Sequence, residues 1–147
     1  MRSHQALIVP ILIGFLSLGA VSYGQDFPDK PAMRFGRGWI SGNIAFSPDG
    51  KTLAVATSIG IWLYKTEGLE EIGLLEGHVP KVLSLAFSPD GKLLASGDWN
   101  GVIVIWDMRS KRKIAKFDEH AFDVNCLAFS PDGKLLASGG VDSIIRI

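Results

Sequence analysis

The sequence has a single cysteine, Cys126, and no net charge, because 15 basic residues balance 15 acidic ones. One thiol excludes an intramolecular disulfide and any zinc site that needs paired thiolates. Without an excess of positive charge the chain has no overall field to hold a phosphate backbone, so no nucleic acid partner is expected. Long helical periodicity is also missing. The short apolar runs between turn residues favour an all-β fold.

One apolar run stands apart near the N-terminus. Arg2 precedes an apolar stretch over residues 6–20, and Ser22-Tyr23-Gly24 places small residues before the polar Gln25. This pattern is typical of a signal peptide at residues 1–24 with cleavage after Gly24. The stretch is shorter than the ~20 residues that cross a bilayer, so no stable membrane insertion is expected after cleavage; an uncleaved anchor is the alternative. We therefore expect export, to the periplasm or the cell exterior, with residues 25–40 as a spacer or irregular first strand.

The remainder of the chain repeats itself. The segment Ile44–Lys51 recurs as Leu85–Lys92 and as Leu127–Lys134, at periods of 41 and 42 residues. Each copy contains Ser-Pro-Asp-Gly-Lys, in which proline presets φ at one central turn position and glycine takes a left-handed one. The motif therefore predicts a hairpin. In the second copy the flanking runs predict strands over residues 82–87, 93–97, 102–106 and 113–117.

Four strands in about 42 residues, with Gly77-His78 before the first and Trp106-Asp107 ending the third, resemble the WD-repeat family. The resemblance covers everything after about residue 40. It implies β-propeller blades, each a four-stranded antiparallel sheet, in an interaction scaffold that is not an enzyme. It divides the chain into a degenerate repeat at 41–76, a repeat at 77–118, and a repeat at 119–147 that stops before its Trp-Asp pair.

The resemblance further implies a buried hydrogen-bonded set in each blade, made of a histidine, a serine or threonine, an aspartate in a turn, and the tryptophan. Asn100 stands at the turn position where the family has aspartate. The first repeat has Arg37, Val55 and Tyr64 at positions of this set, which is why it is interpreted as degenerate. The members expected in the other two repeats are His78, Ser96, Asn100 and Trp106, then His120, Ser138 and Asp142.

Interpretations of the sequence as a hydrolase, a metal site or an anion-binding site have less support. Serine, histidine and aspartate can form a hydrolase triad, but the chain has no Gly-x-Ser-x-Gly elbow to present a nucleophile. No metal or cofactor is expected, because His78 and His120 have no third ligand at a useful spacing. The basic stretch 109–116 can attract an anionic polymer, yet a solvated outer hairpin is favoured. Cys126 replaces Ser84 of the preceding repeat and is expected to be buried.

The resemblance places partner binding on the loops at the tops of the blades, and Trp99, in a turn, is the residue to test. A propeller ring needs about 4–8 blades, whereas about two and a half to three are expected here. We therefore predict a scaffold for an unidentified protein partner, as a segment of a longer propeller. The alternatives are a propeller enzyme or sensor whose active part lies beyond residue 147, and a homo-oligomer that closes its ring from several copies. The candidate binding residues are His78, Lys81, Asp98, Trp99, Asn100, Asp123 and Val141.

Overall fold

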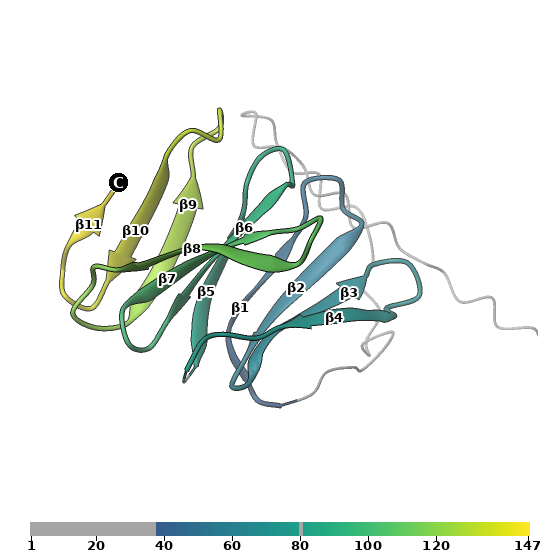
Figure 1. Ribbon diagram of the computed structural model, residues 1–147, viewed down its shortest axis with the longest axis horizontal. Coiled ribbons are helices and arrows are strands. Elements are labelled where there is room, and N and C mark those ends of the chain that lie inside the picture. Colours follow the sequence, from purple (N-terminus) through teal and green to yellow (C-terminus); the bar gives the residue numbers. More distant parts are fainter. Residues whose placement is uncertain (1–37, 80) are drawn as a thin grey trace, which may run out of the picture. The chain divides into compact units, whose positions relative to one another are not determined.

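The computed structural model describes residues 38–79 and 81–147. The chain divides into two units, residues 1–33 and 34–147, and every described residue belongs to the second. The predicted signal peptide and most of the predicted spacer therefore lie outside the described residues. Within them the chain forms eleven strands in three antiparallel sheets and no helix, which confirms the all-β fold class (Figure 1).

Each of the first two sheets contains four strands in sequential order, and the third contains three. The first sheet is made of β1 (Ile40–Phe46), β2 (Thr52–Thr57), β3 (Gly60–Lys65) and β4 (Glu71–Leu75). The second is made of β5 (Val82–Phe87), β6 (Leu93–Asp98), β7 (Val102–Asp107) and β8 (Arg112–Asp118). The third is made of β9 (Val124–Phe129), β10 (Leu136–Gly140) and β11 (Ile145–Arg146). The three sheets are consistent with an incomplete β-propeller, and the strands predicted in the second repeat are confirmed to within one residue at each end.

The Ser-Pro-Asp-Gly-Lys segments form the predicted hairpin turns between the first and second strands of every sheet. In the second sheet Ser88 Oγ donates to Asp90 Oδ1 at 2.7 Å, and the same oxygen accepts the amide of Lys92 at 3.0 Å. Gly91 has a φ of 69°, in the left-handed region that glycine tolerates best. The hydrogen bond from Ser88, followed by that from the Lys92 amide, holds the pKa of Asp90 below its usual value. The turn is therefore fixed by its own side chains.

The sheets stack because the faces that they turn toward one another are apolar. A core cluster joins side chains of β2 and β3, including Ala54 and Leu63, to side chains of β6 and β7, including Leu94 and Trp106. A second cluster joins the opposite face of the second sheet to β9 through Val124. Burial of such side chains contributes on the order of 1.5–3 kcal/mol each. The innermost strands are hydrogen-bonded across these interfaces.

These hydrogen bonds end on carbonyl oxygens at equivalent positions of the second and third repeats, although their donors stand at different positions of the repeat. Ser41 Oγ donates to the carbonyl oxygen of Val82 at 2.7 Å, and Ser84 Oγ donates to that of Val124 at 2.8 Å. Each serine thereby satisfies its hydroxyl inside an otherwise apolar interface. The repeat period in the sequence thus becomes a repeated contact between neighbouring inner strands.

Cys126 was predicted to be buried, and this prediction is wrong, because its side chain is exposed. It lies on β9 at the place that Ser84 has on β5. Ser84 is 2% exposed because the third sheet covers that face of the second. Among the described residues no further sheet covers the corresponding face of the third.

No helix of the described segments has the length and apolarity required to cross a membrane.

The stacking leaves no room for a methyl group at Gly97. A Cβ atom there would lie 2.6 Å from Val124 Cβ and 2.7 Å from Ser84 Oγ. We expect Gly97→Ala to lower the free energy of unfolding by about 1–3 kcal/mol, because it overpacks the interface between the second and third sheets. Urea unfolding followed by circular dichroism measures this.

Gly139→Ala is the matched control, because Gly139 has the same place in the next repeat. A Cβ atom there would approach only the sulfur of Cys126, at 2.7 Å, and that side chain can move. Equal losses of stability for the two variants would contradict the steric explanation.

Candidate functional site

A chain of buried hydrogen bonds crosses the second sheet and ties the loop before β5 to β6 and β7. Trp106 Nε1 donates to Ser96 Oγ at 2.7 Å, and Ser96 Oγ lies 2.6 Å from His78 Nε2. His78 Nδ1 lies 2.7 Å from Asp98 Oδ2. A neutral ring that donates from Nδ1 to the carboxylate accepts the Ser96 hydroxyl at Nε2. Each group then donates to the next in the order Trp106, Ser96, His78, Asp98. The four side chains are buried.

The carboxylate in this series of hydrogen bonds is Asp98. The expectation that Asn100 takes that place is corrected. Asn100 is exposed; its backbone amide donates to Asp98 Oδ1 at 2.9 Å, and its side-chain amide donates to the carbonyl oxygen of Val79 at 2.9 Å. Asp98 is the last residue of β6 and is 1% exposed. It lies two residues after Ser96 and therefore on the same face of the strand, directed at the histidine ring.

Hydrogen bonding keeps Asp98 ionised although it is buried. Burial by itself would raise the pKa of Asp98, but the hydrogen bond from His78 and those from the Val102 and Asn100 amides outweigh it and hold the pKa below 3.8. A depressed pKa in the folded state stabilises the fold at every pH above the unfolded value. That contribution is lost as the pH falls through the folded-state pKa.

The third sheet has a related set with a different geometry. His120 Nε2 lies 2.8 Å from Ser138 Oγ, and His120 Nδ1 lies 2.9 Å from Asp142 Oδ2. Here the carboxylate comes four residues after the serine. Arg146 Nη1 donates to Asp142 Oδ2 at 2.9 Å, a contact that the sequence did not predict. Burial would raise the pKa of Asp142, yet the hydrogen bond from His120 and three others hold it far below its usual value.

The repeats could not reveal Asp98, because its position holds three different residues. The strand registers place Thr57, Asp98 and Gly140 at equivalent points of the three sheets. In the first sheet Thr57 Oγ1 donates to the carbonyl oxygen of Gly60 at 2.8 Å, and Tyr64 occupies the place of Trp106. The only sequence signal for Asp98 was that it is an acidic residue in the turn region, two residues before Asn100.

The serine, histidine and aspartate of the second sheet have the connectivity of a hydrolase triad, but Ser96 is completely buried. Its oxygen contacts His78 and Trp106, and no substrate carbonyl can approach it. In residues 38–79 and 81–147 no three histidine, cysteine or carboxylate side chains are grouped so that they can hold a metal ion. The hydrogen-bonded residues of the second sheet therefore position loops and strands.

The predicted binding residues separate into two groups. His78 and Asp98 are 7% and 1% exposed, so they belong to the buried chain and offer no surface to a partner. Trp99 is 52% exposed and Val141 is 55% exposed. Asp123 is half-buried, and its backbone oxygen accepts the amide of Val141 at 3.0 Å.

Other exposed side chains lie beside Trp99. Lys81 is exposed, and its Nζ lies 5.7 Å from the centre of the Trp99 ring. Val79 and Phe122, which sequence reasoning did not single out, are 81% and 60% exposed. A Cβ atom on Gly101 would lie 2.0 Å from the carbonyl oxygen of His120, so the β6–β7 turn rests on the loop before β9. We call Val79, Lys81, Trp99, Phe122 and Val141 the loop surface.

Two four-stranded antiparallel sheets and one three-stranded sheet are stacked, and the second and third are each tied by a histidine that precedes the first strand. This arrangement is consistent with an incomplete β-propeller. A family model, WD domain, G-beta repeat, matches residues 69–107 and 111–147, which together make up more than half of the chain. The chain belongs to this WD40 family, whose repeats build β-propeller scaffolds for protein interaction.

The chain is also similar to the antiviral protein SKI8 of Saccharomyces cerevisiae (strain ATCC 204508 / S288c). The two are 34% identical over 95 residues, an alignment that covers 53% of this chain and 24% of that protein. The match therefore spans about a quarter of the relative's length.

The assignment of Asp98 is tested by two single substitutions. We expect Asp98→Ala to lower the free energy of unfolding by at least about 2 kcal/mol, because it leaves the His78 ring and two backbone amides without their acceptor. We expect Asn100→Ala to cost less than about 1 kcal/mol, because its side-chain hydrogen bond is exposed. Chemical unfolding measures both, and a larger loss for Asn100→Ala would reverse the assignment.

Proposed function

We propose that this chain is an exported WD-repeat segment that binds a protein partner through the loop surface. The observation that carries the proposal is the exposure of Val79, Trp99, Phe122 and Val141, whose exposed fractions lie between 52% and 81%. Large apolar and aromatic side chains that protrude from loops are typical anchors of protein interfaces. The WD40 family supports the same conclusion.

The loop surface is held in place before any partner arrives. The amide of Trp99 donates to the carbonyl oxygen of Lys81 at 3.0 Å, which joins the β6–β7 turn to the segment before β5. The buried His78 and Asp98 anchor the same two segments from below. Less backbone conformational entropy of these two segments then remains to be lost on binding, which favours affinity.

Trp99 is the expected centre of the contact. We expect Trp99→Ala to weaken capture of a partner by at least about tenfold, the loss typical of an interface anchor. Ile114→Ala is the control, because Ile114 is 57% exposed but lies on the outer strand β8. The measurement is affinity capture with the purified chain, followed by titration of the captured protein. Unchanged affinity after Trp99→Ala would exclude the loop surface as the main contact.

We also propose that these sheets belong to a ring with additional blades. Ile145 on the third sheet is 76% exposed, and Cys126 on the same sheet is exposed whereas Ser84 is covered. An apolar sheet face of this kind is stable only beneath a neighbouring sheet. A longer WD-repeat chain supplies such a neighbour most directly. Association of copies is the second candidate, supported by the same open face.

Export and assembly are tested on one secreted sample. We expect expression with the native N-terminus to release a product that begins at Gln25, because the first 24 residues have the pattern of a cleaved signal peptide. N-terminal sequencing identifies the cut, and light scattering gives the mass in solution. Retention of Met1 in a membrane fraction would contradict cleavage. A discrete oligomer would favour closure by several copies over completion by a longer chain.

A further inference from the structure

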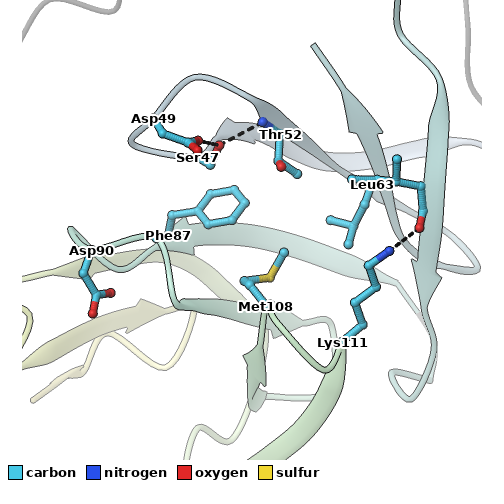
Figure 2. Close-up of a pocket in the computed structure, with 10 residues that line it drawn as sticks. Ser47, Asp49, Thr52, Leu63, Phe87, Asp90, Met108 and Lys111 are labelled. Atoms are coloured by element: carbon cyan, nitrogen blue, oxygen red, sulfur yellow. Dashed lines mark hydrogen bonds between the residues drawn. The ribbon is translucent and has the colours of Figure 1, made fainter. Parts of the chain in front are cut away.

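A cleft of about 180 Å³ lies between the first and second sheets, at the end of the strands that carries the Ser-Pro-Asp-Gly turns. Leu63, Phe87 and Met108 give it an apolar wall, and Asp49 and Asp90 come from the turns of neighbouring repeats. Figure 2 shows the Phe87 ring between Asp49 and Met108, with Lys111 on the other side of the cleft. The cleft therefore combines an apolar wall with opposite charges at its two sides.

Asp49 is an ionised carboxylate at one side of the cleft. Ser47 Oγ donates to Asp49 Oδ1 at 2.6 Å and the Lys51 amide donates to the same oxygen at 3.0 Å. The hydrogen bond from Ser47, then that from the Lys51 amide, holds the pKa of Asp49 below 3.8, so the group is ionised at neutral pH. Both bonds use Oδ1, which leaves Oδ2 for another donor.

The other two turns differ at this point. Lys92 Nζ lies 3.3 Å from Asp90 Oδ2, and Lys134 Nζ lies 3.9 Å from Asp132 Oδ2. Among the described residues the ion pair has no counterpart between Lys51 and Asp49. Asp49 thus lines the cleft without an ion pair to the lysine of its own turn, although the charge of Lys51 contributes to its lowered pKa.

Lys111 places a positive charge on the side of the cleft opposite Asp49. Its Nζ donates to the carbonyl oxygen of Ile72, which fixes the ammonium group on the side of the first sheet's outer strand. A cationic ligand is repelled from that side and attracted toward Asp49. A ligand with an aliphatic stem and a cationic head therefore fits with its head at Asp49 and its stem against Phe87 and Met108.

We propose that this cleft binds an arginine or lysine side chain carried by an extended segment of a protein partner. Arginine suits the site best, because its planar head can contact both the carboxylate and the Phe87 ring. The site lies in the β1–β2 turn region, whereas Trp99 lies in a β6–β7 turn, so it is separate from the loop surface.

The test is a titration of the ¹⁵N-labelled full chain with acetyl-Gly-Arg-Gly-amide, followed by NMR. We expect chemical-shift changes at Leu63, Phe87 and Met108. The citrulline analogue has the same shape without the charge, and we expect it to bind about fivefold or more weakly, as for loss of a charged hydrogen bond. Equal binding of the two peptides, or shift changes confined to residues outside the cleft, would overturn the proposal.

Asp49→Asn and Asp132→Asn form a matched pair of variants. Asparagine retains an oxygen that can accept the Ser and Lys hydrogen bonds of the turn, so both variants are expected to keep the hairpin. Asp49→Asn should weaken the arginine peptide by the factor that separates it from citrulline, whereas Asp132→Asn should leave its affinity unchanged. Equal effects of the two would show a nonspecific charge effect and reject the site. Trp99→Ala should not change this affinity, so failure of the loop surface is distinguishable from failure of the cleft.

Discussion

The structure depends on the burial of both apolar faces of the second sheet by the sheets on either side of it. Leu94, Val104 and Trp106 of the second sheet are buried only because β2 and β3 lie against them, and Ala95 and Ile105 depend in the same way on β9. The approach is close enough that Gly97 has no space for a side chain. Apolar burial of this extent is the dominant favourable term in folding. A single repeat of this chain therefore has no stable structure to adopt without its neighbours.

The buried hydrogen bonds of the second sheet fix the arrangement of its strands more narrowly than apolar contact does. Apolar contact alone tolerates small slides of one sheet over another, whereas Trp106, Ser96, His78 and Asp98 are satisfied in one arrangement only. Since His78 belongs to the loop before β5, the arrangement also fixes where that loop leaves the sheet. Exposed Trp99 follows directly after Asp98. The interior of the blade and the loop surface are consequently two ends of one hydrogen-bonded structure, which links stability to recognition.

Small departures between repeats distinguish otherwise equivalent surfaces. The three hairpin turns have the same internal hydrogen bonds, yet only two of their aspartates form an ion pair with the lysine of the turn. The remaining one, Asp49, faces the cleft between the first two sheets. In the same way, Arg146 enters the polar set of the third sheet at the register position that Val104 has in the second. Function in a repeat protein is expressed in such differences, because the shared residues are already committed to the fold.

The sequence by itself determined the repeat, the hairpins and the all-β class, because these follow from local turn chemistry and from a period that any reader can measure. Most of the buried polar set was implied by the resemblance of the repeats to the WD-repeat family. The sequence did not determine that Asp98 rather than Asn100 contacts His78, since that choice depends on which strand face is turned toward the ring. It also failed for Cys126, whose exposure depends on whether another sheet covers β9. Only the tertiary structure decided these points, together with the cleft at Asp49. The Asp98 contact and the cleft join residues about 20 to 60 positions apart, which no local pattern records, and the exposure of Cys126 follows because no sheet of the described residues covers that face of β9.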